Sequence, residues 1–286
     1  MRKTITEAGE LLEALATAFP DASRTTLRQM LQTARVRVNG EVEKNAKREL
    51  EPDDVIDIAE KQVHRNLPEG LAILHEDSDV IVVFKAHGLL TVPTERERDT
   101  TAQMYLNVYL GEKRGAERIQ VVHRLDRETS GVLVFAKNAY AREQLKEQFA
   151  AHSVDRMYIA LIEGEVKPPR GTFSSYLREM KDLKMVSVPE HPEAKFAVTH
   201  YRTIETNGKY SMLEVTLETG RKNQIRAHLS EAGHPILGDR MYGSTVNPIG
   251  RLGLHAKLLG FDHPVTRKHL VFTSPVPRKF KELLKK

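Results

Sequence analysis

The chain has 286 residues, 40% of them hydrophobic, and its 44 Lys and Arg against 39 Asp and Glu give a formal net charge of +5. This length and apolar content predict a globular protein of one large domain, or of a small domain joined to a larger one, and the basic balance permits a polyanionic partner. The absence of cysteine excludes disulfides, thiolate catalysis and cysteine-ligated zinc.

The sequence also lacks the signals of secretion and membrane insertion. Its first residues are charged but precede no apolar core of signal-peptide length, and no apolar run approaches a membrane span. We therefore expect a cytoplasmic protein without a membrane partner. The twelve histidines form neither a His-x-His nor a His-Glu-x-x-His pair, so we predict no metal site.

The first sixty residues predict a small α/β domain. Apolar residues at helical spacing within 11–19 and 27–34 predict two short helices. Alternating residues around Asn39-Gly40 predict a tight hairpin, and a further strand is expected at 54–58.

Positive charge is concentrated within this small domain. Residues 20–48 contain seven basic side chains and three acidic ones, whereas residues 49–60 contain six acidic side chains and no basic one. Such a one-sided distribution suits an RNA phosphate backbone, although a solvated charged face explains the charge equally well. The residues that we expect to bind RNA are Arg24, Arg28, Arg35 and Arg37.

A larger domain is expected after a polar stretch. Residues 61–70 contain Pro68 and show no periodic pattern, so we divide the chain into a domain at 1–62, a linker at 63–70 and a second domain at 71–286. Apolar runs and helical spacing in the second domain predict strands at 71–77, 80–85, 131–136 and 156–162, and helices at 138–149, 221–232 and 280–284.

The segment His-Arg-Leu-Asp-Arg-Glu-Thr-Ser-Gly at 123–131 places one short carboxylate, Asp126, among three potential cations. The nearby positive charges favour the ionised carboxylate, which is suited to nucleophilic attack, and the following apolar strand gives the loop a rigid support. An acidic turn with solvated ion pairs is the alternative, and on local chemistry alone it is the commoner case.

Two segments carry a resemblance to known families. His-Arg-Leu-Asp-Arg-x-Thr-Ser-Gly followed by an apolar strand resembles the catalytic motif of the RluA-type pseudouridine synthases, and the likeness spans residues 71 to 275. Ser-Arg-x-x-Leu before Val-x-Val-Asn-Gly resembles the alpha-L RNA-binding domain shared with a small-subunit ribosomal protein. The resemblance implies an α+β catalytic domain with a mixed, mainly antiparallel sheet.

The resemblance also implies roles for individual residues. Asp126 is the implied catalytic residue, Tyr158 lies against the target uracil, and Arg221 pairs with Asp126 and keeps it ionised. Without the resemblance, Tyr158 is most simply a core residue with a satisfied hydroxyl. The implied substrate contacts are Arg124, which fills the space left by a flipped nucleotide, together with Ile225, Leu229 and Arg226.

We therefore expect a monomeric pseudouridine synthase that needs no cofactor and acts on structured RNA, ribosomal RNA rather than tRNA. A synthase directed at tRNA is one alternative. A non-catalytic RNA-binding or ribosome-assembly protein is another, against which the set of Asp126, Tyr158 and Arg221 argues. An aspartate-based glycosidase or nuclease would need a second catalytic carboxylate or a metal, and Glu128 is the only nearby acid.

Overall fold

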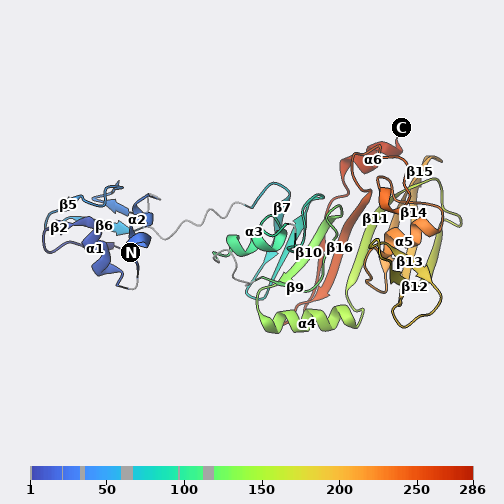
Figure 1. The fold of residues 1–286 in the computed structure, drawn as a ribbon, viewed down its shortest axis with the longest axis horizontal. Coiled ribbons are helices and arrows are strands. Elements are labelled where there is room, and N and C mark those ends of the chain that lie inside the picture. Colours follow the sequence, from blue (N-terminus) through green and yellow to red (C-terminus); the bar gives the residue numbers. More distant parts are fainter. Residues whose placement is uncertain are drawn as a thin grey trace. The chain divides into compact units, whose positions relative to one another are not determined.

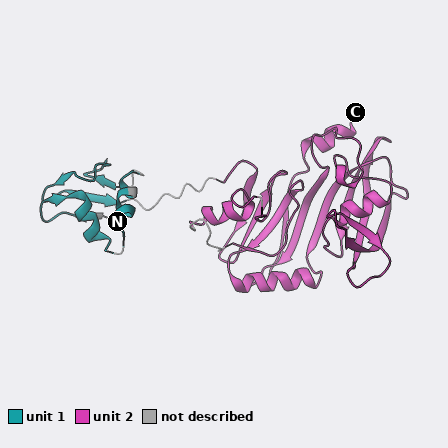
Figure 2. Cartoon of the chain, in the orientation of Figure 1, with its two compact units in different colours: residues 1–65 teal, residues 66–286 magenta. Residues whose placement is uncertain are grey.

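The computed structural model describes residues 2–20, 22–32, 36–58, 67–95, 97–111 and 119–285. Arg35 and residues 63–66 of the expected linker therefore lie outside the described residues. The chain divides into two compact units, Met1–Arg65 and Asn66–Lys286 (Figure 2). None of the helices described is long and apolar enough to cross a membrane.

Unit 1 combines two helices with a four-stranded antiparallel sheet of order β1-β6-β3-β4 and a separate pair of β2 and β5 (Figure 1). Asn39 and Gly40 have φ of 53° and 87°, the left-handed values that a tight hairpin turn requires, so the hairpin prediction is confirmed. The elements are β1 (Arg2–Thr4), β2 (Gly9–Glu10), α1 (Leu11–Ala18), α2 (Arg24–Gln32), β3 (Val36–Val38), β4 (Glu41–Val42), β5 (Glu49–Leu50) and β6 (Val55–Ile58).

One core holds unit 1 together. It is formed by the apolar faces of α1 and α2 and by inward-facing residues of β3 and β6, including Leu15, Leu27, Val36 and Ile56. Because these positions follow helical spacing in the helices and a period of two in the strands, the sequence pattern alone specifies this core.

Unit 2 contains an eleven-stranded sheet of order β13-β12-β14-β15-β11-β16-β10-β8-β7, with β17 paired to β16 and β9 paired to β10 (Figure 1). Among the described strands, neighbours run antiparallel except for the parallel pair β10 and β16. The strands are β7 (Leu71–Glu76), β8 (Val80–Lys85), β9 (Gln120–Val121), β10 (Ser130–Ala136), β11 (Asp155–Glu163), β12 (Arg170–Glu179), β13 (Met185–Val188), β14 (Lys195–Thr206), β15 (Tyr210–Leu217), β16 (Leu254–Asp262) and β17 (His269–Thr273).

Five helical segments accompany this sheet: α3 (Ala102–Tyr109), α4 (Ala139–Ala150), α5 (Gln224–Glu231), the short η1 (Arg240–Tyr242) and α6 (Arg278–Leu284). Asn138 begins α4 because its side chain accepts a hydrogen bond from the Ala141 backbone amide at 2.8 Å, as predicted. Unit 2 is thus a mixed α+β fold with a mainly antiparallel sheet, which confirms the expected class.

The strand that follows Asp126 is the most deeply buried element of the sheet. All seven residues of β10 are buried, which confirms the predicted strand. At its start Gly131 pairs with Ala256 of β16, has φ of 130°, and comes so close that an added Cβ would lie 2.1 Å from the Ala256 carbonyl oxygen. Glycine is therefore required for the parallel contact between β10 and β16.

A buried lysine connects β8 to the Asp126 loop. Lys85, at the end of β8, is fully buried, and its Nζ donates to four carbonyl oxygens. These belong to Leu89 at 2.7 Å, Ala86 at 3.1 Å, Asp126 at 3.2 Å and Arg127 at 3.3 Å. Burial lowers the pKa of Lys85 to about 7, while the carboxylates of Asp126 and Glu128 act in the opposite direction. The backbone of the acidic loop is thus fixed to β8 by one side chain.

We predict that Lys85→Met lowers the free energy of unfolding by about 1–3 kcal/mol, because buried carbonyl oxygens lose a donor while a side chain of similar length fills the space. Denaturant unfolding of the two proteins measures the difference. Lys146→Met, which removes an exposed lysine from α4, is the matched control and should change stability by no more than about 0.5 kcal/mol. Equal stability of wild type and Lys85→Met would contradict the assigned role.

Candidate active site

Asp126 lies in the loop that leads into β10. The backbone amide of Thr129 donates to the Asp126 carbonyl oxygen at 3.1 Å and closes a turn, and the Asp126 side chain remains 31% exposed. Its carboxylate lines a cavity of about 610 Å³, within the size range of small-molecule and nucleotide sites. The cavity is bounded by the Asp126 loop, the end of α4, β11 and the start of α5.

Asp126 is the only acidic residue among the described residues that line this cavity, and five of the others are Arg or Lys. These cationic residues are Arg124, Arg156, Arg221, Lys222 and Arg226. A carboxylate surrounded in this way is attracted to cations from several sides, and a polyanionic ligand would meet a positive surface at the entrance.

The arginine nearest to Asp126 is Arg226. Its Nη1 lies 3.8 Å from Asp126 Oδ2, whereas Arg221 makes no ion pair with Asp126 in the described chain. The expected ion pair of Arg221 with Asp126 is therefore not present in the described structure. The helix begins at Gln224 and not at 221, so Arg226 takes the place in its first turn that faces the loop.

Arg226 is fixed by a second carboxylate. Its Nε and Nη2 donate to Asp239 Oδ2 and Oδ1 at 2.6 and 2.7 Å, and Asp239 is almost completely buried. Its Nη1 also donates to Asn223 Oδ1 at 3.0 Å. The bidentate contact with Asp239 holds the Arg226 guanidinium in one orientation, in which Nη1 faces Asp126.

Asn223 accounts for the geometry at the start of α5. It has φ of 51°, in the left-handed region that asparagine tolerates better than most residues. Arg221 precedes it in the turn, where its Nε donates to the Phe196 carbonyl oxygen at 3.0 Å. Arg221 therefore lines the cavity, but its guanidinium is bound to β14 and not to the acid.

Tyr158 lies on β11 and lines the cavity together with Asp126. The pairing of β11 with β16 shifts register between Met157 and Tyr158, a bulge of the kind that redirects side chains beside active sites. Burial raises the pKa of Tyr158, and the nearby Asp126 carboxylate acts in the same direction. The side chain is therefore a neutral phenol near neutral pH and can donate a hydrogen bond.

Of the three potential cations predicted around Asp126, His123 is uncharged and Arg127 is paired with another acid. His123 Nε2 accepts a hydrogen bond from the Val134 amide at 3.1 Å, and burial lowers the pKa of His123 to about 3, so this ring is neutral. Arg127 forms an ion pair with Glu97. Arg124 is exposed and lines the cavity, so it is the cation of the loop that remains accessible to a ligand.

The two apolar residues expected in the wall differ in position. Ile225 is buried and lines the cavity. Leu229 does not line it, because it lies one turn further along α5 and is completely buried in the core with Leu213 and Ile236. A direct substrate contact for Leu229 is therefore a wrong prediction, and its contribution is to the packing beneath α5.

The arginines of unit 1 are on its surface where they can be described. Arg24 and Arg28 are exposed one turn apart on α2, and Arg24 pairs with the exposed Glu13 at 2.7 Å. Arg37 is exposed on β3 and donates to the Gly40 carbonyl oxygen at 2.9 Å. Arg35 lies outside the described residues.

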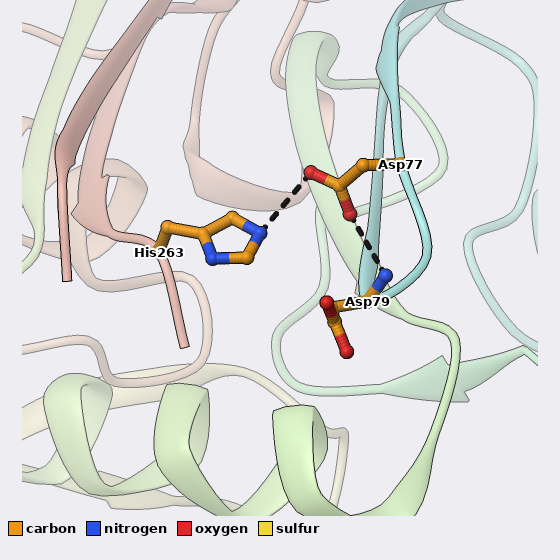
Figure 3. A group of neighbouring side chains, drawn as sticks. All are labelled: Asp77, Asp79 and His263. Carbon is orange, nitrogen blue, oxygen red and sulfur yellow. Dashed lines mark hydrogen bonds and ion pairs between the residues drawn. The ribbon is translucent and has the colours of Figure 1, made fainter. Parts of the chain in front are cut away.

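A second cluster of polar residues has side chains of the types that bind metal ions. Asp77, Asp79 and His263 lie close together where the β7–β8 turn meets the segment after β16 (Figure 3). His263 Nδ1 accepts from two backbone amides of its own turn, so the proton is on Nε2, which donates to Asp77 Oδ2 at 3.1 Å. Asp77 Oδ1 accepts from the Asp79 amide at 2.8 Å. These hydrogen bonds connect the β7–β8 turn to the turn after β16, which accounts for the cluster without a metal ion.

The site residues predicted from the sequence did not include three contributors to the site: Lys85, Asp239 and Arg156. Lys85 contacts the backbone of Asp126, which lies 41 residues further along the chain, and Asp239 binds Arg226, which lies 13 residues before it. Local spacing does not reveal contacts at these separations. Arg156 had a detectable signal, because it lies two residues before Tyr158 and strand periodicity places both on one face.

Comparison with known proteins identifies the family of this chain. Residues 79–231 match the family model described as RNA pseudouridylate synthase, and residues 11–56 match the S4 domain model. The chain is 35% identical over 280 residues to the uncharacterized RNA pseudouridine synthase YlyB of Bacillus subtilis, covering 94% of this chain and 91% of that protein.

A second relative and a solved structure are also similar to this chain. The chain is 31% identical over 292 residues to ribosomal large subunit pseudouridine synthase D of Haemophilus ducreyi, covering 95% of this chain and 89% of that protein. The solved structure of human RNA pseudouridylate synthase domain containing 4 has a TM-score of 0.62 at 27% identity and covers 75% of this chain and 92% of its own. The chain therefore belongs to the RNA pseudouridylate synthase family and carries an S4 domain in its N-terminal part.

Proposed function

We propose that this enzyme isomerises specific uridines of structured ribosomal RNA to pseudouridine, with Asp126 as the catalytic residue. The observation that carries the proposal is the position of Asp126, the only acidic residue among the described residues that line a cation-rich cavity large enough for a nucleotide. In this proposal residues 1–62 bind RNA and residues 71–286 perform the chemistry.

The reaction defines what the cavity must do. The bond from uracil N1 to ribose C1′ breaks, the base turns while it is retained, and C5 bonds to C1′. The C5 hydrogen leaves as a proton and N1 gains one, so neither an oxidant nor a reductant is consumed. Asp126 either attacks the sugar or acts as the base that triggers glycal formation, and both routes need a carboxylate facing the ribose.

Tyr158 and Ile225 would hold the base during this exchange. The Tyr158 ring provides a surface for stacking, and its neutral hydroxyl can donate to a uracil oxygen. To accept the C5 proton it would first have to pass on its own proton. Ile225 adds an apolar wall that would keep the free base from leaving.

A uridine stacked in RNA cannot reach a cavity of this kind, so the nucleotide must be flipped out. Arg124 is exposed beside Asp126 and is long enough to occupy the vacated space. The choice of ribosomal RNA over tRNA is supported by the S4 domain and by relatives named as ribosomal large subunit pseudouridine synthases.

Asp126→Asn tests the catalytic assignment, because the amide preserves shape and removes the negative charge. We predict that full-length enzyme creates pseudouridine at discrete positions when incubated with total RNA, and that Asp126→Asn lowers the rate at least about 10³-fold. Chemical mapping of pseudouridine measures both proteins. Retained RNA binding by the variant shows that its fold is intact, and turnover near wild type would contradict the assignment.

Tyr158→Phe separates a role in the reaction from simple packing, since it removes only the hydroxyl. We expect a single-turnover rate about 10- to 100-fold below wild type with little change in RNA affinity, because a hydrogen bond to the reacting base is lost. Tyr210→Phe, a buried tyrosine outside the cavity, is the matched control. An unchanged rate in Tyr158→Phe would assign its hydroxyl to packing alone.

The S4 domain is tested through its salt dependence. If Arg24 and Arg28 contact phosphates, the double change to Gln should reduce the slope of the logarithm of the binding constant against the logarithm of the salt concentration by about 1.4 to 1.8. The reason is that each phosphate contact releases roughly 0.7 to 0.9 counterion on binding, and two such contacts are lost. Filter binding to ribosomal RNA at several salt concentrations gives the slope. Arg278→Gln with Lys281→Gln removes the same charge from exposed positions on α6 and should leave the slope unchanged. Equal slopes for all three proteins would make Arg24 and Arg28 a solvated face.

A further inference from the structure

Arg156 is a cation of the active-site cavity that has no acidic partner among the described residues. Of the other four cations that line the same cavity, two are in ion pairs, Arg226 with Asp239 and Lys222 with Glu179. Arg156 makes no such ion pair, although it is more than half buried and lies two residues from Tyr158 on the same face of β11.

The guanidinium of Arg156 is held in a defined slot. Its Cζ lies 5.8 Å from the centre of the Phe149 ring, and its Nη2 makes a long hydrogen bond of 3.4 Å to the Glu218 carbonyl oxygen. The backbone of Gly220 comes so near that an added Cβ would lie 2.3 Å from Nη1. The arginine is therefore positioned between an aromatic ring and a glycine.

This slot leaves the cation incompletely satisfied. Arg156 Nε is buried and has no hydrogen-bond partner in the described structure, and burial lowers the pKa of Arg156. A buried guanidinium normally requires an anion or a full set of hydrogen-bond acceptors, because a buried N–H group without an acceptor destabilises the fold. Arg156 also lines the cavity, so its guanidinium can bind an anion that enters there.

We propose that Arg156 binds a phosphate of the nucleotide that enters the cavity, and so provides an anion subsite beside the uracil. The inference rests on the proposed function. Uracil offers only neutral acceptors, whereas the phosphates attached to the ribose are its nearest anions, and a planar guanidinium matches two phosphate oxygens at once. Because Asp126 must face the same ribose, a phosphate contact by Arg156 would orient the sugar toward the acid.

Nucleotide binding to the full-length protein tests the proposal without any turnover. We expect uridine 5′-monophosphate or uridine 3′-monophosphate to bind at least about tenfold more tightly than uridine, the range of a hydrogen bond between charged groups. Arg156→Met should reduce this preference about tenfold. Arg278→Met removes the same group from an almost fully exposed position on α6 and should retain it. Titrations followed by protein NMR give the three dissociation constants for each protein.

Gly220→Ala provides a second test that leaves the net charge unchanged. The new methyl group would meet the far end of the Arg156 side chain, which can move aside, so the fold should survive while the guanidinium is displaced. We expect the same loss of phosphate preference as in Arg156→Met. Thermal unfolding checks that both variants are folded.

Three results would overturn the subsite: a wild type that binds neither monophosphate more tightly than uridine, an Arg156→Met variant with the wild-type preference, or an equal loss in Arg278→Met. Failure of the proposed function gives a different pattern. A protein that shows the Arg156-dependent preference but forms no pseudouridine would retain the phosphate subsite and lose the isomerase assignment.

Discussion

The site depends on the bonds from the Lys85 ammonium to the backbone of the Asp126 loop. A loop that carries a reactive acid must be held at a precise distance from the residues opposite it, and backbone carbonyl groups are the part of a loop that a cation can hold. Lys85 contacts the carbonyl oxygens of Asp126 and Arg127 from β8, while Arg251 Nη2 donates to the Ser130 hydroxyl at 2.8 Å. Two cations from distant strands and loops thus fix both ends of the segment.

Two of the five cations that line the cavity form ion pairs with acids outside its lining. Asp239 fixes Arg226, which faces Asp126, and Glu179 engages Lys222. Such pairing lets these two side chains remain beside one carboxylate without neutralising it completely, because each is already bound to another acid. Arg156, which has no acidic partner in the described chain, is a position beside Tyr158 where the cavity can accept negative charge.

The sequence specified the fold class and most elements of unit 2 because their signals are local. Asn138 predicts the start of α4, and the apolar run at 131–136 predicts β10. The partner of Asp126 could not be predicted in this way. Whether Arg221 or Arg226 faces the acid depends on where α5 begins, and the left-handed Asn223 and the buried Asp239 decide this through contacts that no spacing rule contains. Leu229 was misplaced for a related reason, since helical spacing gives a shared face but not the depth of each residue along it.

We propose that this cavity breaks the glycosidic bond at uracil N1 and forms a new one at uracil C5. Because C5 must lose its hydrogen when it bonds to C1′, RNA transcribed with tritium at C5 of uridine tests this most directly. We expect that wild-type enzyme releases tritium into water, up to one equivalent per modified site, and that the release stops when those sites are consumed. RNA that is bound by the enzyme but releases no tritium over background would contradict it.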